Sequence, residues 1–456
     1  MNGAEIVFLI KIRANSLTKP KRKTFSYRSR AFRHQREEDM KNLSIPGIRR
    51  LLLTASLVAF SASAVDAETL SMWVRKSASD PGQLMVDLWN SKHDNKIELT
   101  AIPDNQLVTK LATSITAGDA PDIVSFDLIY MPDFMKAGFL TDVTDQLNAD
   151  PHYATHVQAY KDIATYDGKI YGVGFTPDVS VLAWNKDLFK KAGLDPEKGP
   201  TTIQEVVDDA AKIRALGGDT YGFWFSGACA GCNIFVTSPM MVASGSKILP
   251  KNGTDEALTG DGVKAVLEAY KTMWDAGDIP AAAETDTGAN FVAAFAGGNI
   301  GIAGTGGFLI SLMKREHPDF NYGLTLLPGT TEGQVSGFVG GDIVAIPAKG
   351  KNEAAAREFL TWVLSDEAQL EGLAKNSILT TRTDLADNEY SKGNEKVLTT
   401  AKALAAGYVP WVFHFADMVN SDSSPWIQML QQAIFDGDVD GAITDAKAAM
   451  LEIAAR

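Results

Sequence analysis

The chain has 456 residues, of which 45% are hydrophobic and 22% charged, an ordinary composition for a globular protein long enough to form two domains. Beyond residue 67 it carries 30 Lys and Arg against 51 Asp and Glu, a net charge of −21. This charge argues against nucleic acid or an anionic membrane as a partner, and it makes a polyanionic substrate less favourable unless a local basic site receives it.

The first 67 residues have the composition of a leader. A basic cluster, K-P-K-R-K, occupies positions 19–23, and residues 41–50 add further basic side chains before an apolar run at 51–60. Small residues follow and end at Ala67. A basic segment, about ten apolar residues and a small-residue cleavage site are typical of a secretory signal peptide. The apolar run is too short to span a membrane.

We therefore expect Met40 to be the true start, residues 1–39 to be an untranslated extension, and residues 40–67 to be a cleaved signal peptide. A nucleic-acid or nuclear-targeting role for the basic cluster is disfavoured because a secretory signal lies directly behind it. No Cys lies near the cleavage site and no later apolar run reaches 18 residues. We expect a soluble protein, without a lipid anchor, in the periplasm.

The exported chain begins with the pattern of a parallel α/β sheet. Apolar or alternating segments at 70–74, 96–100 and 123–124 predict strands, and helical segments that open at 81 and 107 separate them. This β-α-β-α-β order favours a parallel sheet with helices packed on it.

The stretch at 117–127, A-G-D-A-P-D-I-V-S-F-D, carries the clearest functional pattern. Its apolar strand presents Phe126 and Asp127 at the carboxyl end, beyond which ligands bind in open α/β sheets. A carboxylate accepts hydrogen bonds from sugar hydroxyl groups and an aromatic ring covers an apolar sugar face, so the pair is a candidate sugar site. The alternative is an ordinary buried strand followed by a solvated Asp.

Strands and helices continue to alternate along the chain. Gly304, Gly306 and Gly307 either leave the backbone open to close approach by a ligand or form a tight turn. The periodicity predicts strands at 169–173, 179–184, 300–302, 320–327 and 338–346, and helices at 131–138, 186–192, 202–216, 263–276, 352–364 and 425–456.

The two cysteines, Cys229 and Cys232, are spaced C-x-x-C. A disulfide is the default in an exported protein, and free thiols or a redox pair are the alternatives. A thioredoxin-like site needs a helix after the second Cys, and no helix pattern follows Cys232. No paired His or Cys nearby completes a zinc site. We expect a structural disulfide.

The chain resembles the family 1 extracellular solute-binding proteins of ABC importers, the maltose-binding-like group. The segment at 117–127 matches the family's G-x-x-P-D-V block, and Y-D-G-K-I-Y-G-V at 166–173 and W-N-K-D-L-F-K-K-A-G-L-D-P at 184–196 match two more. Residues 299–308 and 337–347 are similar to its later hinge blocks. The resemblance covers essentially all of 68–456.

This resemblance implies an α/β periplasmic binding protein fold with two lobes, a ligand cleft between them and three hinge crossings. We expect residues 68–176 and 301–338 in the first lobe, and residues 177–300 and 339–456 in the second. It implies a periplasmic monomer that captures a sugar, either a mono- or oligosaccharide or a polyol, and delivers it to the transmembrane subunits of an ABC permease. Ligands in the family extend from monosaccharides to oligosaccharides and glycerol phosphates.

Strand ends and the resemblance together nominate the ligand-binding residues. Asp178 stands where the family's chain first crosses between lobes, and Phe308 occupies a slot where many relatives carry a Trp as a stacking platform. Each candidate has a structural alternative, such as a loop Asp for Asp178 and a core ring for Phe308. The full set is Arg75, Asn105, Phe126, Asp127, Asp178, Trp224, Asn233, Phe308, Gly341, Asp342 and Trp411.

No motif indicates an enzyme. The chain lacks G-x-S-x-G, H-E-x-x-H and P-loop patterns, and its six His are too few for a triad or a metal set. A secreted carbohydrate-acting enzyme remains an alternative because a carboxylate pair can cleave glycosides, and a chemotaxis ligand receptor is another. We expect no catalysis, no metal and no cofactor.

Overall fold

The computed structural model describes residues 67–251, 254–421 and 423–456. The expected extension at 1–39 and all but the last residue of the expected signal peptide lie outside the described residues. Among the residues that are described, no helix combines the length and the apolar character needed to cross a membrane.

Three parallel strands with two connecting helices begin the described chain, which confirms the expected β-α-β-α-β order. Strand β1 (Thr69–Arg75) pairs in parallel with β2 (Lys96–Ile102) on one side and β3 (Ile123–Asp127) on the other. Helices α1 (Ser79–Lys92) and α2 (Asp104–Ala117) connect them. Leu70, Met72 and Val74 of β1 are fully buried, as the alternation of a strand packed on helices requires.

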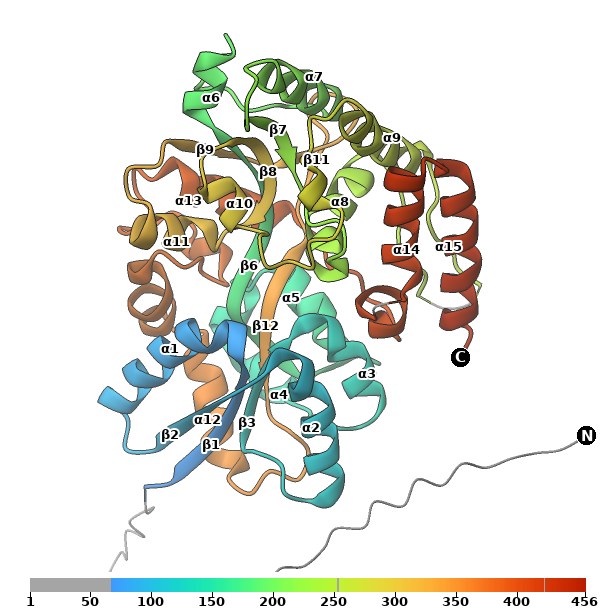
Figure 1. Ribbon diagram of the computed structural model, residues 1–456. Helices are drawn as coiled ribbons and strands as arrows, with labels where there is room; N and C mark the ends of the chain where they lie inside the picture. The colour runs from blue at the N-terminus through green and yellow to red at the C-terminus, as the bar shows by residue number, and fades with distance from the viewer. Residues whose placement is uncertain (1–66, 252–253, 422) are drawn as a thin grey trace, which may run out of the picture. The chain divides into compact units, whose positions relative to one another are not determined.

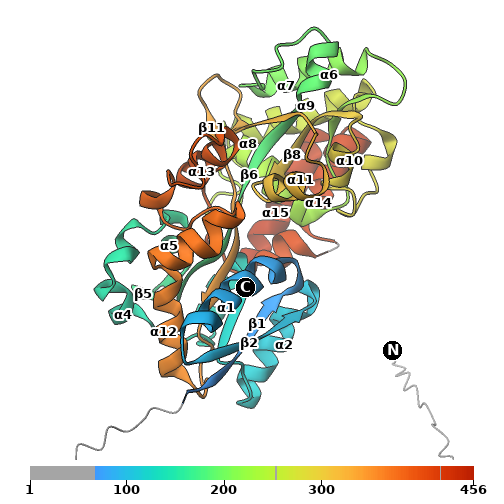
Figure 2. The same ribbon diagram turned by 90° about the vertical axis from the view of Figure 1, so that its left-hand side faces the viewer.

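One long strand joins two parts of the largest sheet, whose order is β2-β1-β3-β12-β6-β8-β7. The first half of β6 (Gly172–Asn185) pairs with β12 (Val339–Ala345), which pairs in turn with β3. The second half of β6 pairs with β8 (Ile300–Gly306) and β9 (Tyr322–Thr325). Figures 1 and 2 show β6 running from the elements around β1 into those around β8. The protein has the two-lobe α/β fold that the resemblance implied.

Each lobe packs its own helices around its part of the sheet. In the first, Trp89 of α1 meets Phe359 of α12 edge-on at 5.3 Å between ring centroids, and in the second, Tyr270 of α9 meets Phe223 of β7 at 5.2 Å. Helices α3 (Met131–Lys136), α4 (Thr144–Ala149) and α5 (Gln158–Ile163) lie between β3 and β6 in the chain, and α12 (Glu353–Val363) follows β12. The other elements after β6 are α6 (Lys186–Lys191), α7 (Ile203–Arg214), β7 (Tyr221–Trp224), α8 (Ala230–Ala243), α9 (Asp261–Asp275), α10 (Ala293–Ala296), α11 (Leu309–Glu316), α13 (Glu395–Ala406), α14 (Pro425–Gln431) and α15 (Val439–Ala454).

Short elements complete the fold. Strands β4 (Thr165–Tyr166) and β5 (Lys169–Ile170) form a hairpin, as do β10 (Leu327–Pro328) and β11 (Val335–Ser336). The expected helix at 425–456 is divided into α14 and α15, because Gly437 adopts a left-handed φ of 84° between them.

The strand pairings differ from the expected division of the chain between lobes. That division assigned 301–338 to the first lobe and everything from 339 onward to the second. Instead, β8 and β9 pair beside the second half of β6, while β12 pairs with β3 and α12 packs on α1. The segments at 300–306 and 339–345 are short, Gly-containing apolar strands, and such a pattern predicts a strand without indicating its neighbour.

Replacing Gly341 of β12 by Ala is expected to lower the free energy of unfolding by about 3 kcal/mol or more. Gly341 has a φ of +92°, and a Cβ there would lie 2.0 Å from the backbone oxygen of Thr176 on β6. The matched control is Gly138→Ala, at a φ of +68° with nothing within 4 Å, which should cost about 1–2 kcal/mol. Urea unfolding followed by circular dichroism compares them, and equal losses would contradict a role for the close approach.

Candidate functional site

Two strand ends and an antiparallel neighbour bring one arginine and two aspartates together. Arg75 and Asp127 are the last residues of the parallel strands β1 and β3, so they lie at the same sheet edge. Asp342 of β12 lies directly opposite Asp127. The Arg75 guanidinium donates through Nε to Oδ1 of Asp342 at 2.5 Å, and through Nη1 to Oδ2 of Asp127 at 3.0 Å.

These three charges form a partly buried ion-pair network. Asp342 is fully buried, and burial raises its pKa to about 6 although Arg75 acts in the opposite direction. Ser125 donates its hydroxyl to the second oxygen of Asp342 at 2.9 Å. Burial lowers the pKa of Arg75, but Asp342 and Asp127 together raise it by more, so the guanidinium keeps its charge. Arg75 is therefore held by protein carboxylates.

Asp127 combines a structural role with exposure. Burial raises its pKa, against the influence of Arg75, yet 27% of its side chain is exposed. Its Oδ1 also accepts a hydrogen bond from the backbone N–H of Ile129 at 3.3 Å and so caps the short 3-10 helix at Leu128–Tyr130. Asp127 thus braces the end of β3 while it remains open to solvent.

Asp178 lies on the same face of the sheet as this network, in the strand that crosses between lobes. Thr176 of β6 lies directly opposite Asp342 of β12. Asp178 follows Thr176 by two residues on the same strand, so its side chain lies on the same face of the sheet as that of Asp342. Oδ1 of Asp178 has no hydrogen-bond partner. Burial raises the pKa of Asp178 to about 7, although nearby backbone N–H groups of Val179, Gly307 and Phe308 act to lower it. Oδ1 is therefore a buried acceptor without a hydrogen bond, in a residue that is itself partly exposed.

The side chains of Phe308 and Asp178 both lie against Gly306. A Cβ built on Gly306 would lie 2.4 Å from the Phe308 ring and 2.7 Å from Oδ2 of Asp178, so both side chains cover the space that the missing Cβ leaves. The Phe308 side chain is 38% exposed, unusual for a large apolar ring. A carboxylate and an accessible aromatic ring therefore stand side by side where β8 ends, the pairing that suits a sugar.

Unbonded polar atoms also gather at the carboxyl ends of β7 and β8. These strands are parallel, with Trp224 opposite Ala303. Ser226 and Thr305, which follow these two positions in the chain, therefore lie at the same end of the sheet. Asn233 of α8 reaches this edge, because its Nδ2 donates to the backbone oxygen of Ser226 at 2.8 Å. Buried side-chain atoms without partners in this region are Trp224 Nε1, Ser226 Oγ, Asn233 Oδ1 and Thr305 Oγ1. Buried polar groups are normally bonded, so these are candidates to meet a ligand or bound water.

Some predicted ligand residues do not join this site. Phe126 is fully buried and packs on Phe134 at 5.1 Å between centroids, so it offers no face to a sugar. The expectation for Phe126 is wrong, since successive residues of a strand point to opposite faces and Asp127 takes the other one. Asn105 is exposed near the start of α2. Trp411 donates its indole N–H to the backbone oxygen of Thr165 at 3.1 Å.

Sequence reasoning missed three hydroxyl groups, those of Thr176, Ser226 and Thr305. Each is a buried polar residue whose oxygen lacks a partner. Their one signal in the sequence is a hydroxyl residue inside or just after an apolar strand. That signal is weak, because such residues usually bond to a nearby backbone group.

The disulfide lies beside the edge that carries Ser226 and Asn233. Cys229 and Cys232 are joined, with Cα atoms 5.3 Å apart, and Gly288 packs so closely that a Cβ there would lie about 3 Å from both sulfurs. Helix α8 begins at 230 and contains Cys232, which corrects the expectation that no helix follows the second cysteine. The sequence of this helix shows no helical periodicity, because the helix is apolar on most faces and contains Pro239.

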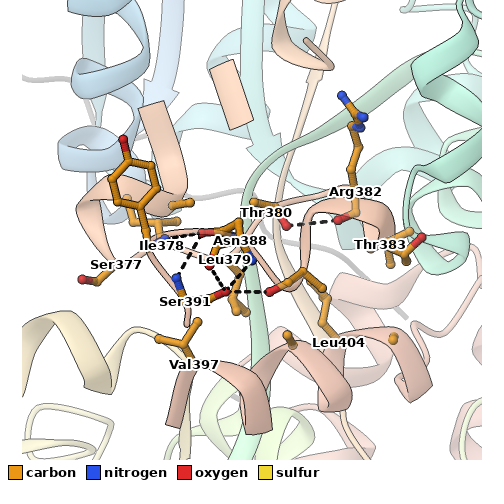
Figure 3. A pocket seen from close by; sticks show the side chains of 16 residues that line it. Ser377, Ile378, Leu379, Thr380, Arg382, Thr383, Asn388, Ser391, Val397 and Leu404 are labelled. Carbon is orange, nitrogen blue, oxygen red and sulfur yellow. Dashed lines mark hydrogen bonds between the residues drawn. The ribbon is translucent and has the colours of Figure 1, made fainter. Parts of the chain in front are cut away.

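Two cavities elsewhere have a different character. One of about 60 Å³ lies between α13 and residues 374–391, and Figure 3 shows its wall. The polar groups of this wall already bond to one another, as those of Thr380, Asn388 and Ser391 show. They therefore leave few hydrogen-bonding groups for a ligand. The other, of about 610 Å³, lies between the loop around Lys247 and residues 408–412. Neither is lined by Asp178, Phe308 or the Arg75 network.

A two-lobe α/β protein with polar groups gathered at the strands between its lobes has the architecture of a ligand-binding receptor. The family described as bacterial extracellular solute-binding protein matches residues 77–370, and the chain belongs to this family. A putative binding protein of Brucella abortus (strain 2308) is 25% identical over 405 residues, which are 87% of this chain and 96% of the relative.

Two further proteins show the extent of the similarity. The diacetylchitobiose binding protein of Streptomyces coelicolor is 26% identical over 353 residues, which are 75% of this chain and 79% of the relative. The crystal structure of an ABC transporter solute binding protein from Thermotoga lettingae TMO, bound with α-D-tagatose, superimposes with a TM-score of 0.73. That structure is 21% identical and covers 85% of this chain and 100% of its own, which establishes the shared fold.

Proposed function

We propose that the protein is the substrate-binding protein of an ABC importer and captures a sugar, namely a mono- or oligosaccharide or a polyol, for delivery to the membrane permease. The observation that carries the proposal is the pair of Asp178 and Phe308 over Gly306, a carboxylate acceptor and an exposed ring at the crossing strands. The named ligand of the Streptomyces coelicolor relative, diacetylchitobiose, is a sugar and supports the same class.

The proposed capture uses hinge closure around this site. We infer that two crossings run side by side, at 178–180 on β6 and at 338–340 before β12, since Ser180 and Phe338 bond to each other there. A third crossing lies between 376 and 395. The first lobe then holds 68–178 and 340–376, and the second holds 180–338 and 395–456. Closure brings the network of Arg75 toward the edge of Trp224.

Delivery requires export and a partner. The expected signal peptide at 40–67 would send the protein to the periplasm, and the transmembrane subunits of the permease would recognise the closed lobes. We propose a monomer, because one chain contains both walls of the site. The secreted carbohydrate-acting enzyme and the chemotaxis receptor remain as second candidates, the first because Asp127, Asp178 and Asp342 supply carboxylates.

A thermal-shift screen of purified protein over a panel of neutral mono-, di- and trisaccharides and polyols tests the function. A sugar present at 100 times its dissociation constant should stabilise the protein by about 2.7 kcal/mol. Product analysis after long incubation with each stabilising sugar is the control for enzymatic turnover. Detection of cleaved sugar would mean that the protein is an enzyme rather than a binding protein. Stabilisation by no member of the panel would count against the proposed ligand class.

A further inference from the structure

We propose that the site accepts sugars without negative charge and rejects phosphorylated sugars, glycerol phosphates and uronates. This inference rests on the proposed function and narrows it, because glycerol phosphates lie within the ligand range that the resemblance implied. The observation behind it is the balance of charge and of hydrogen-bonding groups around Asp178.

The first step is that the cation of the site is already neutralised. Arg75 is bonded to Asp342 and Asp127, and it is the cation whose field acts on Asp127, Asp178 and Asp342 alike. Asp104 adds a further negative field at Asp127. Above the pKa of about 7 of Asp178, three carboxylates on one face against one guanidinium leave an excess of negative charge where a phosphate or uronate would need a cation.

The second step is that a protein carboxylate already stands beside the helix N-terminus at the site. Helix α11 begins at Leu309, and the N–H groups at such an end favour an anion. Asp178 lies beside this end, since its Oδ1 would lie 3.4 Å from a Cβ on Gly307, while the Gly307 N–H itself donates to the backbone oxygen of Val179. An anion bound at this N-terminus would therefore lie beside the Asp178 carboxylate and be repelled by it.

The third step concerns the unbonded atoms. Asp178 Oδ1 and Asn233 Oδ1 are acceptors, Trp224 Nε1 is a donor, and Thr176 and Thr305 are hydroxyl groups that serve as either. A sugar hydroxyl both donates and accepts, so it matches this mixture. Above pH 7, where Asp178 is ionised, a phosphate or carboxylate ligand only accepts and leaves the two acceptor oxygens without partners, which is costly for buried groups.

Matched ligands test the inference by isothermal titration calorimetry at about pH 8, above the pKa of about 7 of Asp178. The probes are D-glucose, D-galactose, D-mannose and their β-1,4-linked disaccharides, each as the neutral sugar, its C6 carboxylate and its C6 carboxamide, with glycerol and sn-glycerol 3-phosphate as a further pair. The carboxamide has nearly the shape of the carboxylate without its charge. In any series that binds, we expect the carboxylate to be at least about tenfold weaker than the carboxamide, with the gap narrowing from 20 to 300 mM salt.

Variants separate the site charge from the net charge of the protein. Asp178→Asn removes one carboxylate of the site and should narrow the gap between carboxylate and carboxamide. Asp119→Asn removes an equal charge from a side chain that is 87% exposed and should leave the gap unchanged. An equal narrowing by both variants would overturn the assignment, because it would attribute the discrimination to the overall field.

The outcomes also distinguish this inference from the proposed function. A carboxylate or glycerol 3-phosphate that binds as tightly as its neutral counterpart would overturn the charge preference and leave sugar or polyol capture standing. Loss of that binding on Lys76→Ala would then assign the exposed Lys76, next to Arg75, as the anion's partner. Binding of no probe in any form would count against both proposals.

Discussion

Replacing Asp178 by Ala is expected to weaken sugar binding about ten- to a hundredfold without lowering the stability of the ligand-free protein. Hydrogen bonds to a charged acceptor contribute about 1.5–3 kcal/mol, and each 1.4 kcal/mol changes affinity about tenfold. Oδ1 of Asp178 has no partner to lose in the ligand-free protein. Calorimetric titration with a sugar from the stabilising panel, paired with the melting curve of the ligand-free variant, measures both effects.

Asp127→Ala is the contrasting variant. Asp127 is already bonded to Arg75 and to the N–H of Ile129, so its removal should lower the melting temperature of the ligand-free protein. The opposite result would be a lowered melting temperature for ligand-free Asp178→Ala and an unchanged one for Asp127→Ala. It would contradict the assignment of Asp178 as an acceptor that is free to bind the ligand.

The same residue predicts a pH dependence of stability. Burial raises the pKa of Asp178 to about 7 in the folded protein, whereas an unfolded Asp titrates near 3.9. The folded state therefore holds this proton more tightly, and the stability it contributes is complete below about pH 4 and is lost as the pH rises through about 7. Melting temperatures of the ligand-free protein should fall between pH 5 and 8, and less steeply in Asp178→Asn. Identical slopes would contradict the raised pKa.

Replacing Arg75 by Met is expected to destabilise the protein by about 3–5 kcal/mol, because it breaks a buried ion pair by removing one partner. The substitution keeps most of the side-chain volume but leaves the fully buried Asp342 without its cation. The urea midpoint of unfolding should fall accordingly. Adding Asp342→Asn should restore much of the loss, because the second change removes the buried charge that the first leaves unpaired.

Lys264→Met provides the matched control. Lys264 pairs with Asp440 at 2.6 Å, but the two side chains are 46% and 78% exposed, and exposed pairs contribute about 0–1 kcal/mol. A loss for Arg75→Met no larger than that of the control would mean that the network is hydrated rather than buried. Failure of the double variant to recover stability would show that Arg75 acts through packing instead.

The local elements were predictable because their causes are local. Apolar or alternating residues predicted β1, β2 and β3. The helix expected at 202–216 begins as predicted, because the hydroxyl of Thr202 accepts the N–H of Glu205 at 3.1 Å and so caps α7. The composition of the site was also predictable, as a carboxylate with an aromatic ring at a strand end. The pairing of its members was not, because Asp178 and Phe308 were nominated separately, and because Phe126 and Asp127 are sequence neighbours that a strand sends to opposite faces.

The sequence by itself determined the α/β class, the family and the separate strands and helices, since each depends on periodicity, capping or short motifs within a few residues. The tertiary structure alone decided which strands pair, where the chain crosses between lobes, and which side chains meet. Asp178 lies beside the ring of Phe308, and Arg75 bonds to the carboxylate of Asp342, which is 267 positions away in the sequence. Such contacts depend on the register of distant strands and on the space left by Gly306, which no local pattern contains.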